Sequence, residues 1–115
     1  MPSVLIADDE EDLRFIFNRV LSKLYTVYEA DTGLRAIELY EKHQPDLVIM
    51  DTRMPGLDGI EATRRIMHAH PDARIIGVTG YADKNAAFQE AGALAVIQKP
   101  FSLAELSEYV AKYLQ

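Results

Sequence analysis

The segment from Val4 to Phe15, "VLIADDEEDLRF", joins a run of apolar residues directly to five consecutive acidic residues. A short apolar run that ends in polar residues is typical of a buried β-strand. The acidic residues that follow repel one another, and a folded domain tolerates them only if water, helix amides or a cation offsets their charge. We therefore expect a positive group near the end of this strand.

The composition narrows the class of protein. With 115 residues and 49% apolar content, the chain is long enough for one domain over residues 1–115 and too short for two. The net charge of −6 disfavours nucleic acid and anionic lipid as partners, and the absence of cysteine excludes disulfides and thiolate zinc sites. No N-terminal apolar segment is long enough for a signal peptide or a membrane span, so the expected compartment is the cytoplasm.

Short apolar runs alternate along the chain with longer segments of helical period. The predicted strands are residues 3–8, 25–30, 46–51, 74–79 and 94–99. Three of them are almost wholly apolar, which suits strands of a parallel sheet that is buried on both faces. Helical spacing follows at 13–24, 60–67 and 103–113, and more weakly at 34–42 and 83–91. Five strand–helix units predict an α/β fold with a doubly wound sheet and five helices.

The first and last helical segments carry further local signals. The first has a one-sided apolar stripe that should face the core, formed by Leu13, Ile16, Phe17, Val20, Leu21 and Leu24. Phe15 lies almost opposite this stripe on a helical wheel. Ser102 and Glu105 have the spacing of a capping box, which predicts the start of the last helix.

Polar residues gather where the predicted strands end. Asp8 and Asp9 follow the first strand, and Asp51, Thr79 and Lys99 end the third, fourth and fifth. Ligands of open parallel sheets bind at the carboxyl ends of the strands, so these side chains should share one edge. Three carboxylates without Cys or His form a hard oxygen site that suits Mg²⁺.

Each of these residues also has a purely structural interpretation. Asp8 and Asp9 alone could be helix caps, Thr79 an ordinary strand residue and Lys99 a surface lysine. Their shared position at one edge of the sheet favours the functional interpretation. Three histidines, His43, His68 and His70, fall at expected helix ends and are interpreted as exposed or as matched to the helix dipole, rather than as metal ligands.

Four motifs occur in a characteristic order, "IADDEED", "VIMDTRMPGLDG", "GVTGY" and "QKPF". In this order and spacing they resemble the receiver domain of two-component response regulators over essentially the whole chain. The resemblance implies a flavodoxin-like sheet with strand order 2-1-3-4-5, which is known from the chemotaxis regulators of this family. It also implies a response regulator that signals by conformational change and is not an enzyme in the usual sense.

The resemblance implies a role for each acidic residue. Asp51 would accept a phosphoryl group from a phosphohistidine of a histidine kinase or a phosphotransfer protein. Mg²⁺ would be held by Asp8, Asp9, Asp51 and the backbone carbonyl of Arg53, and would neutralise the phosphoryl oxygens. The residues themselves favour a different interpretation for Glu10 to Asp12, as the solvated first turn of a helix whose dipole their charges match.

The resemblance also covers residues around the phosphoryl group. Lys99 and the Thr79 hydroxyl would contact phosphoryl oxygens, and Gly80 would leave room for them. The bond between Lys99 and Pro100 is expected to be cis. Asp58 is placed to cap a helix.

Four further positions suggest how this member differs from others. Many receivers carry an aromatic residue or histidine where this chain has Val96, so the usual aromatic switch is in doubt. Arg53 and Tyr81 would flank the path of the hydrolytic water, which predicts a long-lived phosphorylated state that suits a phosphorelay. Phe15 could anchor a partner helix near Asp51, or it could be an ordinary exposed apolar residue.

Several alternatives differ from a stand-alone receiver. The chain could be a receiver excised from a larger regulator with an effector domain, although Met1 lies only two residues before the first strand. A Mg²⁺-dependent phosphatase with an aspartate nucleophile would leave Asp51 without a role. A flavodoxin-like FMN carrier conflicts with the five acidic residues, because they would repel the FMN phosphate. A P-loop enzyme is excluded because its glycine-rich motif is absent.

Overall fold

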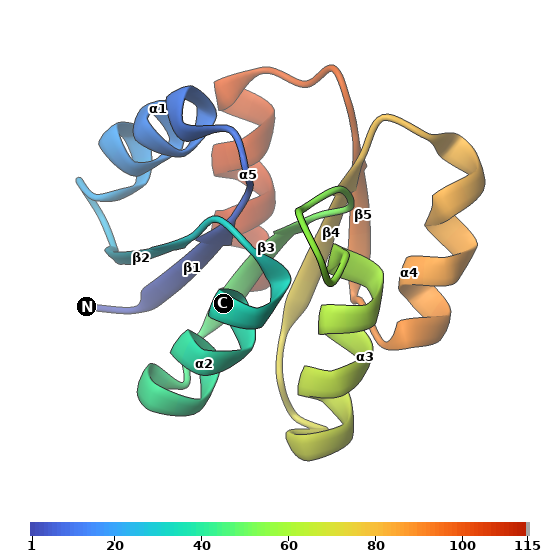
Figure 1. Ribbon diagram of the computed structural model, residues 1–115. Helices are drawn as coiled ribbons and strands as arrows, with labels where there is room; N and C mark the ends of the chain where they lie inside the picture. The colour runs from blue at the N-terminus through green and yellow to red at the C-terminus, as the bar shows by residue number, and fades with distance from the viewer. Residues whose placement is uncertain (115) are drawn as a thin grey trace.

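The computed structural model describes residues 1–114, in which strands and helices alternate (Figure 1). The strands are β1 (Ser3–Ala7), β2 (Thr26–Ala30), β3 (Leu47–Asp51), β4 (Ile75–Thr79) and β5 (Ala95–Gln98). The helices are α1 (Glu11–Leu21), α2 (Gly33–His43), α3 (Gly59–Ala69), α4 (Asn85–Ala91) and α5 (Leu103–Tyr113), and a 3₁₀ turn, η1 (Ala82–Lys84), precedes α4. The five predicted strands and the five predicted helices are all present.

The strands form one parallel sheet in the order β2-β1-β3-β4-β5. This is the flavodoxin-like order that the family resemblance implied, and it is confirmed. Ala7 pairs with Met50 at the carboxyl ends of β1 and β3. The residues that follow these two, Asp8 and Asp51, are therefore neighbours at the edge of the sheet.

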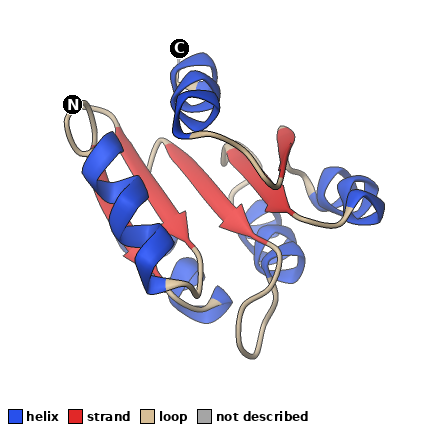
Figure 2. Ribbon diagram, turned by 90° about the horizontal axis from the view of Figure 1, so that it is seen from above, coloured by secondary structure: helices blue, strands red, loops and turns tan. Residues whose placement is uncertain are grey.

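The helices cover both faces of the sheet, with α1 and α5 on one side and α2, α3 and α4 on the other (Figure 2). Side chains of a strand point alternately to the two faces, so Val4 and Ile6 belong to the α1–α5 core while Leu5 and Ala7 belong to the α2–α4 core. All four are buried. This explains why the strands are continuously apolar instead of alternating with polar residues.

The predicted stripe of α1 is only partly correct. Phe17 and Leu21 are buried, but Ile16 is 41% exposed and Leu24 is 67% exposed. Leu24 lies beyond the end of the helix at Leu21, where the helical period no longer applies. Ile16 lines an open groove beside α5 and does not enter the core.

The histidines agree with the prediction only in part. His68 is exposed as expected, but His43 and His70 are half-buried. The ring of His43 stacks on Tyr28 of β2, with 4.0 Å between ring centroids, and His70 contacts the ring of Tyr40. These aromatic partners come from other elements, so the local sequence could not indicate them.

Most local predictions at the helix ends are confirmed. Ser102 and Glu105 form the capping box of α5, and the Asp58 side chain accepts a hydrogen bond from the backbone N–H of Glu61 at the start of α3. The Lys99–Pro100 bond is cis. The weak prediction for residues 83–91 is correct from Asn85 on, whereas Asp83 belongs to the 3₁₀ turn. None of the helices in residues 1–114 has the length and apolar character needed to cross a membrane.

Candidate functional site

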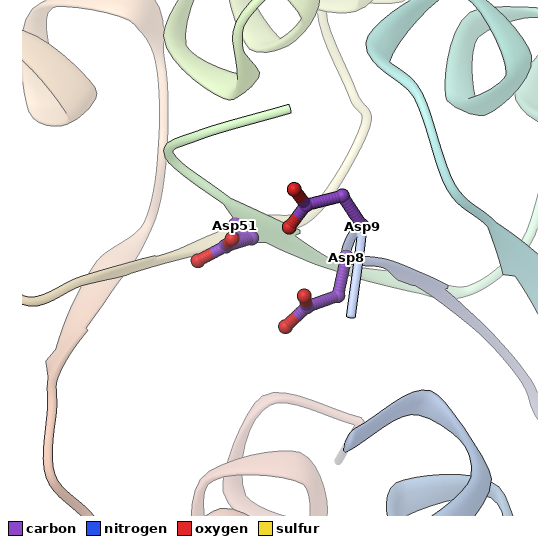
Figure 3. A group of neighbouring side chains, drawn as sticks. All are labelled: Asp8, Asp9 and Asp51. Carbon is purple, nitrogen blue, oxygen red and sulfur yellow. The ribbon is translucent and has the colours of Figure 1, made fainter. Parts of the chain in front are cut away.

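Three carboxylates meet at the carboxyl edge of the sheet (Figure 3). Asp8 and Asp9 come from the turn after β1, and Asp51 is the last residue of β3. Each offers an oxygen that lies within 4.8 Å of the others. Asp8 and Asp51 are almost fully buried, and Asp9 is exposed. The predicted acidic cluster is therefore present.

The backbone that follows Asp51 is packed tightly against neighbouring elements. Thr52 donates both its N–H and its hydroxyl to the carbonyl of Val78, at 3.0 and 2.7 Å. Gly59 donates its N–H to the Thr52 carbonyl at 2.8 Å, and a Cβ at this glycine would overlap the carbonyl oxygen of Asp51. The position of Asp51 thus depends on β4 and on the close approach of α3.

Lys99 supplies a positive charge inside the site. Its Nζ lies 3.1 Å from Oδ1 of Asp51, and its side chain is 30% exposed. Burial alone would lower the pKa of Lys99, but the carboxylates of Asp51, Asp8 and Glu10 together outweigh this effect and raise it. Burial raises the pKa of Asp51, and Lys99 offsets only part of that increase. The pair therefore leaves the acidic cluster short of positive charge.

Asp8 is the clearest sign of this shortage. Burial raises its pKa from 3.8 to about 6, although the backbone N–H of Glu10 donates to its Oδ1 at 2.9 Å and favours the ionised form. The neighbouring Asp51 raises the pKa further. A carboxyl group that ionises with difficulty in the absence of a cation is expected where a cation is meant to bind.

The donor set fits Mg²⁺ better than a transition metal. Every candidate ligand is an oxygen, and neither Cys nor His belongs to the cluster. A pocket of about 400 Å³ opens over the site and leaves room for water and a phosphoryl group. The sequence predicted the lining residues Asp9, Asp51, Arg53, Gly80, Tyr81 and Lys99, and it missed Glu10 and Thr52 in this role.

Two of the three predicted modulating residues, Arg53 and Tyr81, line this pocket, whereas Val96 does not. Thr79 is fully buried, and its hydroxyl accepts from the N–H of Tyr81 at 3.0 Å and lies 3.3 Å from the Tyr81 carbonyl. The guanidinium of Arg53 stands 4.6 Å from the centre of the Tyr81 ring, in cation–π geometry. Val96 is a half-buried residue of β5 that packs against the α2–α4 core.

Phe15 is 60% exposed on α1, with the Arg19 guanidinium 5.9 Å from its ring centre. It does not line the acidic pocket. A separate apolar groove of about 610 Å³ lies between α1 and the start of α5. The sequence interpretation missed this groove, which is lined by Leu13, Ile16, Phe17, Lys99, Pro100, Phe101 and Leu103.

Comparison with known proteins gives the family. The response regulator receiver domain family matches residues 4–111. The chain belongs to this family. It is a phosphoryl-accepting signalling domain of the response regulator type, and domains of this type are generally not enzymes.

Individual relatives of this receiver are similar over nearly its whole length. The sporulation initiation phosphotransferase F of Bacillus subtilis is 38% identical, with 96% of this chain and 92% of that protein covered. The crystal structure of the response regulator TrrA of Thermotoga maritima, in complex with Mg²⁺ and BeF, has a TM-score of 0.89 at 32% identity, and 98% and 99% of the two chains are covered. The response regulator GacA of Pseudomonas viridiflava is 33% identical over 96% of this chain, but the chain spans only 54% of GacA.

Proposed function

We propose that Asp51 is the phosphoryl acceptor of this receiver and that the donor is a phosphohistidine on a histidine kinase or a phosphotransfer protein. The position of Asp51 carries the proposal. It is buried at the end of a central strand, with one oxygen directed to Lys99 and with Asp8 and Asp9 as neighbours. The single-domain boundary at 1–115 and the cytoplasmic location stay predictions.

The proposed transfer needs only the phosphohistidine, the Asp51 carboxylate and a proton from solvent. An oxygen of the Asp51 carboxylate attacks the phosphorus, and the bond between phosphorus and the imidazole nitrogen of the donor breaks. The donor imidazole, protonated by solvent on its other nitrogen, leaves as the neutral base, and Asp51 becomes an acyl phosphate. Water later hydrolyses the acyl phosphate to inorganic phosphate and the Asp51 carboxylate. The domain would assist both its phosphorylation and its dephosphorylation.

Residues of the chain position the reacting groups. Asp8, Asp9, Asp51 and the Arg53 carbonyl would hold Mg²⁺, which when bound supplies positive charge for the phosphoryl oxygens. Lys99 would move its hydrogen bond from Asp51 to a phosphoryl oxygen. Most of the barrier to phosphoryl transfer is lowered by this kind of positioning and charge, so a small site suffices.

Signalling would begin at Thr79. Its hydroxyl must leave the backbone of Tyr81 before it can donate to a phosphoryl oxygen. This exchange frees the loop that carries Tyr81 and changes its contact with Arg53. Because Val96 has no ring to reorient, we assign to Tyr81 the signalling role that an aromatic residue takes on β5 in other receivers.

Arg53 and Tyr81 would also control how long the signal lasts. Both line the mouth of the pocket above Asp51, and their side chains are in contact. A water molecule must pass this pair to reach the acyl phosphate in line. We therefore propose slow hydrolysis, as suits a relay intermediate.

The docking surface for the donor would combine Phe15 with the apolar groove, which is lined by the next two residues of α1, Ile16 and Phe17. Ile16 and Leu103 are 41% and 39% exposed at this groove, and Lys99 connects it to the acidic pocket. A donor helix seated there would bring its histidine close to Asp51. Exposed aromatic and aliphatic residues of this kind are common anchors of protein interfaces.

The test is phosphorylation without a protein donor. Incubation with Mg²⁺ and acetyl phosphate or phosphoramidate should add one phosphoryl group, detected by mass spectrometry of the intact protein. The adduct should tolerate acid, be lost in base and be absent in Asp51→Asn. An adduct that persists in Asp51→Asn would contradict the assignment. Release of phosphate from many unrelated esters would indicate a phosphatase instead.

A further inference from the structure

Arg14 of α1 makes two contacts that tie the acidic turn to the edge of the sheet. Its Nη1 donates to the backbone carbonyl of Asp8 at 2.7 Å, and its Nε donates to Oε1 of Glu29 at 3.2 Å. Only 14% of the Arg14 side chain is exposed. A guanidinium buried to this extent keeps one geometry, which an exposed arginine does not.

Glu29 in turn is held by a second donor. The Asn18 amide, one turn further along α1, donates to Oε2 of Glu29 at 2.7 Å. Both carboxylate oxygens of Glu29 are therefore used, one by Arg14 and one by Asn18. Because Glu29 balances the charge of Arg14, the guanidinium can bond to Asp8 without placing a net positive charge beside the metal site.

Asp8 is consequently held at three points. Its N–H donates to the carbonyl of Ala30 at 3.0 Å, its carbonyl accepts from Arg14, and its Oδ1 accepts from the N–H of Glu10. These contacts determine the backbone direction at Asp9, the next ligand. The acidic turn is therefore tied to β2 and α1 by hydrogen bonds of its own.

We propose that Arg14 is a positioning residue for the cation, and that the Arg14–Glu29–Asn18 cluster sets the Mg²⁺ affinity by holding the Asp8–Asp9 turn. The inference rests on the proposed Mg²⁺ site. Arg14 touches no ligand oxygen of that site and acts through the Asp8 backbone.

The expected effects follow the number of contacts that are lost. Arg14→Gln removes the charged donor to Asp8. Loss of a hydrogen-bond partner of a metal ligand typically weakens metal affinity by 10- to 100-fold. We expect the Mg²⁺ dissociation constant to rise roughly tenfold. Arg14→Lys keeps a donor but cannot bridge both partners, so its effect should be intermediate. Glu29→Gln keeps the Asp8 contact and should raise the constant by roughly threefold.

The experiment is isothermal titration of the whole chain with MgCl₂, combined with thermal unfolding in EDTA. Arg35→Gln is the matched control, because Arg35 forms an exposed pair with Glu38 on α2 and should leave the dissociation constant unchanged. Hydrogen exchange at the amides of residues 8–10 gives an independent readout. In Arg14→Gln these amides should exchange faster, whereas those of β3 should not.

The two measurements separate positioning from simple stabilisation. If Arg14→Gln lowers the unfolding temperature but binds Mg²⁺ as tightly as the parent, the cluster is structural and the inference is wrong. Should Arg14→Gln fail to fold, an unchanged dissociation constant in Glu29→Gln would overturn the inference equally. A parent that does not bind millimolar Mg²⁺ would overturn both this inference and the proposed metal site, whereas normal binding in every variant would overturn this inference alone.

Discussion

The two sides of the acidic pocket are held in different ways. On the β1 side, Asp8 is bonded through its N–H, its carbonyl and its carboxylate to three other residues. On the β4 side, the Thr79 carbonyl accepts from the N–H of Lys99 and the side chain of Gln98, at 2.8 and 3.2 Å, but the Thr79 hydroxyl bonds only to the backbone of Tyr81, two residues away. Tyr81 is 43% exposed. The backbone is thus tied to neighbouring elements on both sides; the β1 side adds the buried guanidinium of Arg14, whereas the β4 side carries a hydroxyl with a local partner that it can exchange.

This difference has a chemical meaning for a receiver. A cation site works best when its ligands already have their final geometry, because no free energy is then spent on ordering them. A signalling site instead needs groups that change partners when the phosphoryl group arrives. The β1 side suits the first task, and the β4 side suits the second.

The largest expected effect comes from crowding the backbone of Asp51, which ends β3 between the two sides. Gly59→Ala places a Cβ on the carbonyl oxygen of Asp51 and should lower the free energy of unfolding by about 3 kcal/mol. In Gly80→Ala on the β4 side, the new Cβ meets only the Lys99 Cβ at 3.9 Å. This variant should change the free energy of unfolding by less than about 0.5 kcal/mol. Urea unfolding of the two variants measures both values. Equal losses would mean that the backbone at Asp51 is packed no more tightly than the loop at Gly80.

The next effect concerns protonation on the β1 side. The pKa of Asp8 is about 6 in the fold and 3.8 in the unfolded chain, so its protonation stabilises the fold at low pH and this contribution disappears as the pH rises through 6. In EDTA, the parent should lose about 2 kcal/mol from this group between pH 4 and pH 7.5, after allowance for screening.

The comparison with Asp8→Asn isolates this contribution from those of the other carboxylates. The difference in unfolding free energy between parent and variant should change with pH in EDTA. This dependence on pH should be weaker in saturating Mg²⁺, because the cation then takes the place of the proton. A pH-independent difference would show that Asp8 ionises normally. Mg²⁺ affinity of the parent should also weaken below pH 6, because protons and the cation compete for the same carboxylate.

On the β4 side, the prediction is kinetic. Replacing Arg53 by Asn and Tyr81 by Ala together opens the approach of water to the acyl phosphate and should speed its loss about tenfold, which corresponds to about 1.4 kcal/mol of barrier. The phosphorylated proteins are freed of donor and followed in Mg²⁺ by intact mass. Arg35→Asn serves as the control. Decay of the double variant at the parental rate would remove the support for a long-lived signal.

The smallest expected effect tests the surface outside the pocket. Phe15→Ala should slow transfer from a phosphohistidine phosphotransfer protein roughly fivefold, for a loss of about 1 kcal/mol, and leave the reaction with acetyl phosphate unchanged. Leu34→Ala on α2, which removes a side chain of similar exposure (55%), should affect neither reaction. Equal slowing with both donors would mean that Phe15 supports the site itself.

Much of the fold could be predicted because it depends on local patterns. The buried strands appear as apolar runs, and the capping box of α5 is visible in Ser102 and Glu105. The acidic cluster could be predicted because parallel strands bring their carboxyl ends to one edge, so Asp8 and Asp51 meet although they are far apart in sequence. The position of Lys99 beside Asp51 could be predicted for the same reason, because Lys99 follows the last strand.

The remaining features depend on contacts between elements that no local pattern encodes. The sequence suggested that the acidic segment needs a positive neighbour, yet Arg14 was not recognised, because its role depends on Glu29 of the adjacent strand. Ile16 matched the apolar period of α1, but it faces a groove because α5 does not cover it. The stacking of His43 on Tyr28 was likewise invisible before the strand and helix were placed together.

One contact in the α2–α4 core explains how closely the short helix α4 packs on β4. The Phe88 ring lies over Gly77 so closely that a Cβ there would come within 2.6 Å of it, and Phe88 is the middle residue of the seven in α4. The Phe88 ring therefore fills the space that any side chain at position 77 would need, and the centre of α4 can pack this close to β4 only because residue 77 is glycine.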